Sequence, residues 1–301
     1  MAGGNGGRSR RIGRRPPNGS GPLVLIGGAC SPAGDALGAF VAEARGGPIV
    51  GLTTASADPA GSARAWLRDF EEAGATDVHF PIVARREDAE RVEIARRIAG
   101  AAGIFLGGGD QIKLVATISG TPAEEAIREV WHRGGAICGT SAGAAALTET
   151  TLAHGEVDEE GNEVEMYIGP GLGLLGYRAL IDTHFAQRRR LHRLFVAIAG
   201  YPELLGLGID EDTALVVRGH VGTVVGRGGV TFVDGRTVRY DNAGQVSRGG
   251  QITLSHLRVG LIGTGHEFDL RERELVAVMR MEQGGAARVP VAASDVRPRR
   301  R

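Results

Sequence analysis

The stretch Gly139-Thr140-Ser141-Ala142-Gly143 is the most informative part of this chain. It follows an apolar run at 135–138 and opens an alanine-rich segment at 144–147. A strand, a sharp turn with serine at its apex and a helix together make the nucleophile-elbow context of the G-x-S-x-G pattern. The helix N-terminus behind Ser141 would supply N–H groups and positive partial charge where an oxyanion forms. We therefore predict a nucleophilic serine at a strand end of an α/β fold.

Short apolar runs alternate with helical patterns on the N-terminal side of this elbow. We expect strands at 23–27, 48–53, 77–83 and 103–106, and helices at 63–73, 88–99 and 123–132. This alternation predicts a mostly parallel sheet covered by helices on both faces. The site of such a sheet lies outside the carboxyl ends of its strands. Three glycine-marked strand ends, at 27–28, 107–109 and 139, point there.

After residue 211 the pattern changes to strand alternation. The pairs Gly228-Gly229 and Asp234-Gly235 are hairpin turn signals between these strands. They predict an antiparallel β extension of the sheet that ends near residue 279. The acidic segment 149–170 does not continue the alternation of strands and helices, and we expect a long loop or hairpin there. It would be either a solvent-exposed loop or a lid over the site.

Composition narrows the functional classes. The 35 basic and 35 acidic residues balance, which gives no global electrostatic reason to expect a nucleic-acid partner. Two cysteines, Cys30 and Cys138, are too few for a disulfide framework and too isolated for a zinc site, so we expect small buried hydrophobes. No apolar run approaches the length of a membrane span.

The two ends of the chain differ from its middle. Residues 1–21 are rich in arginine and glycine, and residues 284–301 are similarly basic, so we expect two disordered tails around a single domain at 22–283. The first tail lacks the apolar stretch of a secretory signal, which favours a cytoplasmic location.

A nucleophilic serine needs a base, and the base needs an orienting acid. His184 ends the apolar run 177–181, where a strand end would place it on the rim beside Ser141. Spacing alone leaves its acid partner open: it could be a loop carboxylate or one of Asp182, Asp210, Glu211 and Asp212. Ala142 would give one oxyanion N–H, and the second would come from the glycine turn at 108–110.

An arginine-rich segment follows His184. Residues 187–193 open a helix whose apolar stripe is Leu191, Leu194, Phe195 and Ile198. A solvated basic face is the default interpretation. Several arginines beside a candidate catalytic histidine instead favour carboxylate binding, because arginine grips carboxylates bidentately. Asp182 and Gln111 near the same rim would suit a cationic group such as a guanidinium.

Five ordered blocks resemble the cyanophycinase family and, with their flanking pattern, cover roughly residues 22–280. They are GGDQIKL (108–114), GTSAGAA (139–145), GPGLGLL (169–175), IDTHFAQR (181–188) and GIDEDTAL (208–215). The resemblance implies a serine exopeptidase related to aspartyl dipeptidase, with a class I glutaminase-like α/β sandwich and usually a homodimer. Its substrate would be cyanophycin, a poly-aspartate backbone with arginine on each side chain, and its products β-Asp-Arg dipeptides.

The resemblance also implies roles for single residues. Ser141 matches the family nucleophile, His184 the base and Glu211 the acid, with the oxyanion held by the N–H groups of Ala142 and Gly109. The substrate-binding positions are Gln111, Asp182, Thr183, Arg188, Arg190 and Arg193. No metal or cofactor is implied.

Two positions depart from the family pattern. Thr183 stands where the family usually has Gln, and Lys113 where it often has Arg. Thr183 is shorter and lacks an amide, so it puts the identity of the substrate in doubt. The alternatives are a related peptidase acting on aspartyl or isoaspartyl dipeptides, a non-catalytic relative that binds acidic or arginine-rich polymer, and a nucleotide-binding protein.

Overall fold

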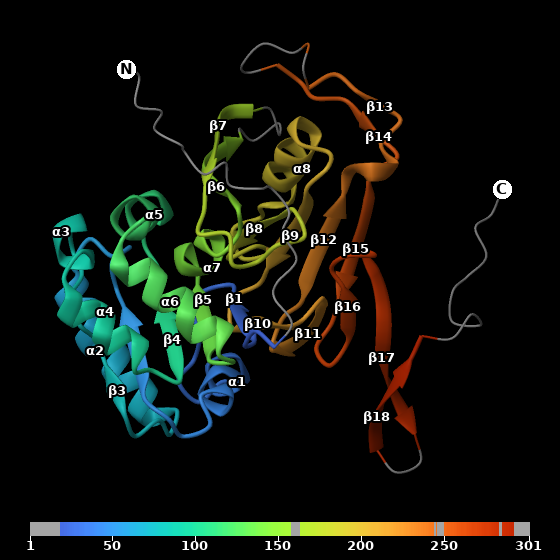
Figure 1. Cartoon of the computed structure of the whole chain (residues 1–301). Helices are drawn as coiled ribbons and strands as arrows, with labels where there is room; N and C mark the ends of the chain where they lie inside the picture. Colours follow the sequence, from blue (N-terminus) through green and yellow to red (C-terminus); the bar gives the residue numbers. More distant parts are fainter. Residues whose placement is uncertain (1–18, 158–162, 244, 246–249, 283–284, 292–301) are drawn as a thin grey trace, which may run out of the picture.

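The computed structural model describes residues 19–157, 163–243, 245, 250–282 and 285–291. Its main sheet has ten strands in the order β18-β17-β16-β11-β10-β1-β5-β4-β2-β3 (Figure 1). The parallel strands are β1 (Leu23–Ile26), β2 (Ile49–Leu52), β3 (Val78–His79), β4 (Gly103–Leu106) and β5 (Ala136–Thr140). The antiparallel strands are β10 (Thr213–Arg218), β11 (Val221–Gly226), β16 (Glu267–Asp269), β17 (Glu274–Glu282) and β18 (Gly285–Pro290).

Strand β1 joins the two halves of this sheet. It pairs in parallel with β5 on one side and antiparallel with β10 on the other. The predicted parallel sheet and its antiparallel C-terminal extension are therefore confirmed, and the two are continuous.

Helices cover both faces of the parallel half. The eight α-helices of the described residues are α1 (Asp35–Glu43), α2 (Pro59–Glu72), α3 (Arg86–Ala89), α4 (Val92–Ala99), α5 (Gln111–Ile118), α6 (Pro122–His132), α7 (Ala142–Ala146) and α8 (Leu191–Gly200). Alternate residues of one strand point to opposite faces. Val24 and Ile26 of β1 accordingly pack in one core with Phe40 of α1 and Phe70 of α2. Leu23 and Leu25 pack in the other core, with α4, α5, α6 and α7.

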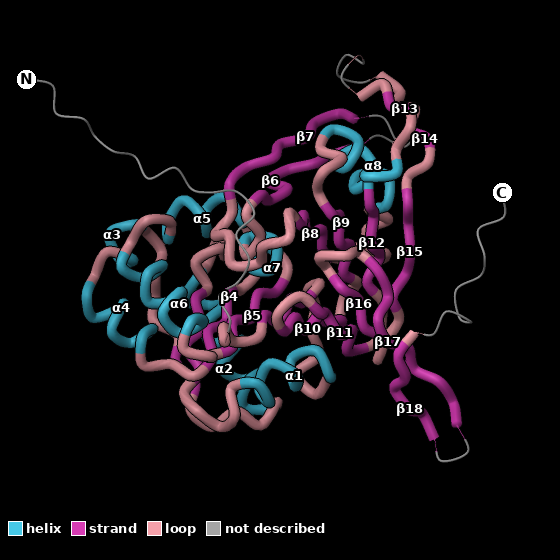
Figure 2. Tube along the Cα trace, turned by 45° about the vertical axis from the view of Figure 1, so that its right-hand side comes forward, coloured by secondary structure: helices cyan, strands magenta, loops and turns pink. Residues whose placement is uncertain are grey.

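A second, four-stranded sheet was not predicted. It consists of β8 (Ala179–Thr183), β9 (Leu205–Ile209), β12 (Val230–Asp234) and β15 (Arg258–Ile262), in the order β15-β12-β9-β8. Helix α8 lies on one face, where Leu194 and Ile198 pack with Leu180 and Val233. Figure 2 shows this strand-rich half beside the helix-covered half. The strand that precedes His184 thus belongs to a different sheet from the strand that precedes Ser141, so the two strand ends do not share the edge of one sheet.

The physical reason is the path of the chain after β9. It turns at residues 210–212 and returns as β10, which takes the place beside β1 that a further parallel strand would have taken. β8 and β9 pair in parallel with each other, as a β-α-β unit should, but close their own sheet with β12.

Several element boundaries differ from the sequence expectation. The helix expected at 88–99 is divided into α3 and α4, and the strand expected at 77–83 is reduced to β3. The helix expected from Gln187 begins at Leu191, because residues 186–190 form turns in which Arg189 has φ +51°. Of the expected stripe, Leu194 and Ile198 are buried, whereas Leu191 is exposed.

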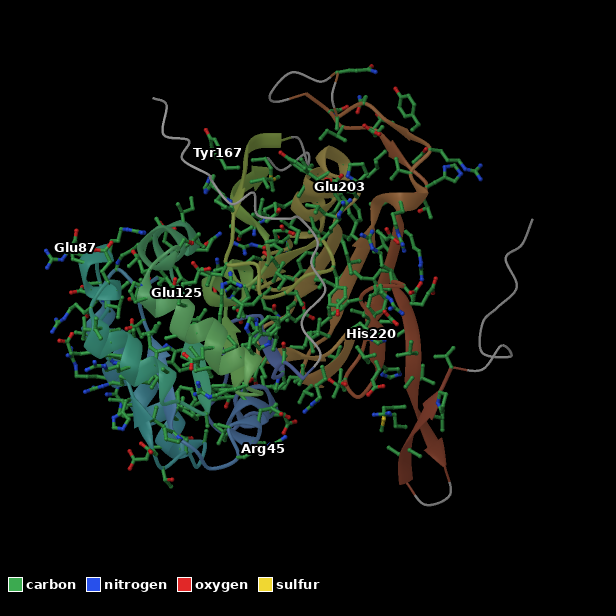
Figure 3. The ribbon with its side chains drawn as sticks, in the orientation of Figure 1. Arg45, Glu87, Glu125, Tyr167, Glu203 and His220 are labelled. Atoms are coloured by element: carbon green, nitrogen blue, oxygen red, sulfur yellow. The ribbon has the colours of Figure 1, made fainter. Side chains whose placement is uncertain are left out.

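The acidic segment forms a hairpin, one of the two forms expected. Its strands are β6 (Thr150–Val157) and β7 (Glu163–Pro170), and its residues 158–162 lie outside the described residues. Tyr167 projects from β7 and is 53% exposed (Figure 3). The smaller elements are the 3-10 helix Gly235–Thr237 and the strands β13 (Tyr240–Asp241) and β14 (Leu254–Ser255).

Most of the two expected tails lies outside the described residues. Residues 285–290 are an exception, because they form β18 and pair with β17 where we expected a disordered tail. The pair Gly284-Gly285 is a hairpin signal. The basic composition of residues 284–301 nevertheless favoured a tail. Within the described part of the chain, no helix is long and apolar enough to cross a membrane.

Candidate active site

Ser141 sits on a strained turn between β5 and α7. Its backbone has φ +52° and ψ −118°, a conformation that side chains rarely adopt. The turn needs the glycines that flank it. A Cβ at Gly139 would lie 2.6 Å from the Ala144 nitrogen, and one at Gly143 would lie 2.7 Å from the carbonyl carbon of Leu106. The predicted elbow is therefore present, and it holds the Ser141 side chain half-exposed.

A continuous chain of hydrogen bonds links Ser141, His184 and Glu211. Ser141 Oγ lies 2.9 Å from His184 Nε2, and His184 Nδ1 lies 2.6 Å from Glu211 Oε1. For Nε2 to accept the serine proton, the neutral imidazole must carry its own proton on Nδ1, where the carboxylate accepts it. The side chain of His184 is 11% exposed and that of Glu211 33%. This arrangement can deprotonate a serine hydroxyl and stabilise the resulting imidazolium.

The neighbouring acids that the sequence left open are engaged elsewhere. Asp210 accepts hydrogen bonds from the N–H groups of Ala186 and Gly229, each at 3.0 Å. Asp212 accepts one from the Ser31 N–H at 2.9 Å. Of the acids left open, only Glu211 hydrogen-bonds to His184 within the described residues.

The Gly27-Gly28 turn after β1 positions His184. The His184 N–H donates to the Gly27 carbonyl at 2.7 Å, and the Asp212 N–H donates to the Gly28 carbonyl at 3.0 Å. Gly28 has φ +105°, and a Cβ there would lie 3.0 Å from His184 Nδ1 and closer still to Nε2 and Cε1. Glycine is therefore required at Gly28, because its backbone lies directly against the imidazole. The sequence marked this strand end but not its contact with the base.

Gln187 also supports the acid, and sequence reasoning assigned it no role. Its Oε1 accepts a hydrogen bond from the Glu211 N–H at 3.0 Å. The only sequence signal for it was its place inside the block at 181–188.

The glycine turn between β4 and α5 borders the serine. A Cβ at Gly108 would lie 3.2 Å from Ser141 Cβ, so this turn passes directly beside the nucleophile. The Asp110 N–H donates to the Ala55 carbonyl at 2.9 Å, which removes Asp110 from the candidate oxyanion donors. Ala142 is the first residue of α7, and its N–H has no carbonyl one turn earlier in the helix to bind.

Asp182, Arg190 and Arg193 form a largely buried cluster at the end of the strand that precedes His184. Asp182 Oδ1 lies 3.1 Å from Arg190 Nη1, and Asp182 Oδ2 lies 2.8 Å from Arg193 Nε. Arg193 Nη2 also contacts Asp182 Oδ1. The Asp182 side chain is 1% exposed, and it holds guanidinium groups of its own chain. Burial lowers the pKa of Arg190, the attraction of Asp182 opposes this, and the positive charges of Arg193 and Arg188 add to the lowering.

Gln111 and Arg193 both hold the β6–β7 hairpin. Gln111 Nε2 donates to the carbonyls of Leu152 and Ala153 at 2.6 and 2.9 Å, and Arg193 Nη1 donates to that of Gly155 at 3.0 Å. The hairpin is thus fixed to the body at its base.

The remaining two predicted substrate positions differ in exposure. Thr183 is 6% exposed, and its carbonyl accepts from Arg190 Nη1 at 2.7 Å. Arg188 is exposed, and its guanidinium makes no hydrogen bond or ion pair within the described residues. The described residues contain no cluster of three or more His, Cys, Asp or Glu placed to hold a metal ion.

Comparison with known proteins places this chain in a family. The model for peptidase family S51 matches residues 46–225. The cyanophycinase of Synechococcus elongatus is 37% identical over 227 residues, which cover 74% of this chain and 70% of that protein. The cyanophycinase of Trichormus variabilis is 36% identical over 228 residues, covering 75% of this chain and 76% of that protein.

A solved structure is also similar. A peptidase from an acI-B1 Actinobacterium superimposes with a TM-score of 0.60 at 22% sequence identity, covering 83% of this chain and 97% of that chain. At this identity the likeness extends to the fold alone. The elbow, the α/β sandwich and these relatives define the chain as a serine peptidase. It belongs to peptidase family S51.

Proposed function

We propose that this serine peptidase hydrolyses cyanophycin from a chain end and releases β-Asp-Arg dipeptides. The observation that carries the proposal is the unbroken hydrogen-bond chain from Ser141 through His184 to Glu211. It occurs in a chain whose relatives at 36–37% identity are named cyanophycinase. The hydrogen bonds link the three residues in the expected roles, with His184 as the base between the nucleophile Ser141 and the acid Glu211.

In the acylation half of the reaction, Ser141 Oγ attacks the carbonyl carbon of an aspartyl peptide bond. His184 Nε2 takes the serine proton, and Glu211 stabilises the imidazolium through Nδ1–H. The N–H groups of Ala142 and Gly109 hold the oxyanion of the tetrahedral intermediate. The C–N bond then breaks, and the leaving amine takes the proton from Nε2, which leaves an ester on Ser141.

Water completes the reaction by the reverse sequence of proton transfers. His184 Nε2 takes a proton from water as its oxygen attacks the ester carbonyl. The second tetrahedral intermediate collapses, Ser141 Oγ leaves and recovers the proton from Nε2, and the product leaves as a free carboxylate. Each proton that His184 accepts is returned within the same half-reaction.

Substrate charge suits Arg188, whose guanidinium has no ion-pair partner among the described residues. Arg188 is exposed and lies close enough to Arg190 for its charge to lower the pKa of that guanidinium. A substrate carboxylate bound to Arg188 would relieve this repulsion and accept a bidentate pair of hydrogen bonds. Asp182, Arg190 and Arg193 then act indirectly, by fixing the backbone at Thr183 and the β6–β7 hairpin at Gly155. Gln111 Oε1 remains for a substrate guanidinium, because its Nε2 is committed to the hairpin.

A related peptidase that acts on aspartyl or isoaspartyl dipeptides is the second candidate. The observation that favours it is Thr183, which is buried beside His184 and cannot reach as far as glutamine. Incubating the protein with insoluble cyanophycin and, separately, with Asp-Arg dipeptides of α and β linkage distinguishes the two. Mass spectrometry should detect β-Asp-Arg from the polymer. If the protein cleaves the dipeptides and leaves the polymer uncleaved, the second candidate is the better assignment.

The variant Thr183→Gln restores the usual family residue and serves as the matched comparison. If Thr183 merely substitutes for glutamine, the two proteins should share one ranking of substrates. A cytoplasmic location and a homodimer are further proposals, supported by the resemblance to cyanophycinase. Light scattering on the purified protein would test the dimer.

A further inference from the structure

Lys113 is the single lysine of the chain, and it contacts the loop that borders the nucleophile's glycine turn. It belongs to the first turn of α5 and is half-buried. Its Nζ donates a hydrogen bond to the Ser56 carbonyl at 2.6 Å. Ser56 lies in the segment Thr53–Ser56, which follows β2 at the carboxyl end of the sheet.

The end of β2 and this segment together support the turn Gly107–Gly109. The Gly107 N–H donates to the Leu52 carbonyl and the Asp110 N–H to the Ala55 carbonyl, each at 2.9 Å. Gly109 packs so closely that a Cβ on it would lie 2.9 Å from the Ser56 nitrogen. The position of the glycine turn is therefore set by the position of the segment beneath it.

The glycine turn cannot hold its own geometry. Glycine has the widest choice of backbone conformation, so consecutive glycines must be fixed from outside. Two of the fixing contacts are neutral backbone hydrogen bonds. The Lys113 ammonium acts on the segment instead, by donating to the Ser56 carbonyl, and a hydrogen bond from a charged donor is roughly twice as strong as a neutral one. This hydrogen bond also ties α5, which follows the glycine turn in the chain, to the segment that packs against the turn.

We propose that Lys113 is a positioning residue for the hydrolysis, whose ammonium holds Thr53–Ser56 against Gly107–Gly109 and thereby aims the turn's N–H groups at the oxyanion. The inference rests on the proposed function in that the turn supplies an oxyanion donor. Removing such a donor outright typically lowers kcat by about 100- to 1,000-fold. Loosening its support has a smaller effect, and we expect kcat to fall about tenfold with KM within twofold.

The variants Lys113→Met and Lys113→Arg provide the first test. Methionine keeps the apolar stem and loses the donor, whereas arginine keeps a charged donor. Lys113→Met should lower kcat about tenfold, and Lys113→Arg should recover most of it. The rate of Ser141 labelling by a fluorophosphonate should change in parallel, because that reaction also builds negative charge beside the glycine turn. Wild-type labelling and turnover in Lys113→Met would overturn the inference, as would an effect confined to KM.

Chemical acetylation of the folded wild-type protein avoids any folding defect of the variants. Lys113 is the only lysine, so acetylation changes this side chain and the N-terminal amine alone among the chain's amines. Lys113→Arg treated in the same way controls for the N-terminus. Acetylation should slow fluorophosphonate labelling about tenfold in the wild type and leave it unchanged in Lys113→Arg, and equal rates in both would refute the role of Lys113. Fluorophosphonate labelling needs no particular peptide. Labelling of untreated wild type without polymer hydrolysis would therefore reject the proposed substrate and leave this test intact.

Discussion

Replacing Gly28 with alanine perturbs the placement of the base directly. The added Cβ would lie 3.0 Å from His184 Nδ1 and closer to Nε2, whereas ordinary contact begins at about 3.5 Å. The imidazole must therefore move by roughly 1 Å. Such a shift would take the 2.9 Å bond between Ser141 Oγ and His184 Nε2 beyond hydrogen-bonding range. Because a misplacement of about 1 Å costs roughly 100-fold in rate, we expect kcat to fall about 100-fold.

Gly74→Ala is the matched control. Gly74 also has a positive φ, +86°, but nothing lies within 4 Å of the Cβ that alanine would add. Both variants therefore place an alanine at a positive φ, and only Gly28→Ala also pushes the imidazole. Gly28→Ala should lose at least as much Tm in thermal unfolding as the control, while turnover and fluorophosphonate labelling fall only in Gly28→Ala. Activity of Gly28→Ala within threefold of the control would refute the reasoning.

Three further predictions concern buried charges and thiols. Asp182→Ala leaves two guanidiniums without their carboxylate, so urea unfolding should show a loss of about 3–5 kcal/mol, and a loss under about 1 kcal/mol would argue against the cluster. Burial raises the pKa of Cys30 to about 11. Iodoacetamide should therefore label Cys30 at pH 8 about 100-fold more slowly in the folded protein than in urea. Rapid labelling of Cys30 in the folded protein would contradict this. Burial raises the pKa of Asp234, but hydrogen bonds from Arg236 and Arg273 outweigh it and hold the pKa below its ordinary value. The stabilisation from the Asp234 carboxylate is present above its unfolded pKa of about 3.9 and is lost as the pH falls. Asp234→Asn should therefore be less stable than the wild type at pH 7, and the difference in unfolding free energy should shrink below about pH 4. A difference that does not depend on pH would show that the Asp234 carboxylate is not stabilised by these arginines.

The elbow and the strand ends were readable from the sequence because each has a local cause. Ser141 needs small flanking residues for its strained turn, and the strand at 103–106 ends where expected, at the glycines 107–109. His184 and Glu211 each follow such a strand, so their place at a strand end could be inferred without knowing which strands pair.

The sequence did not reveal how those strand ends come together. β8 and β9 form a second sheet because β10 returns beside β1, and strand pairing is a non-local property that alternation does not encode. The choice among the three consecutive acids likewise depends on the backbone turn at Asp212, where φ is +51°. The pairing of Asp182 with Arg190 and Arg193 was hidden for the same reason. Residues 8 and 11 positions apart meet only once the turn at 186–190 has redirected the chain.

Comparing the wild type with Ser141→Ala on insoluble cyanophycin tests the central claim most directly. Soluble β-Asp-Arg, measured by mass spectrometry, should appear with the wild type and fall on the order of 10⁶-fold with the variant, as in other serine triads. The variant should keep the wild-type thermal unfolding, because a half-exposed hydroxyl adds little to stability. Release of the dipeptide by well-folded Ser141→Ala at a wild-type rate would contradict the assignment of Ser141 as the nucleophile.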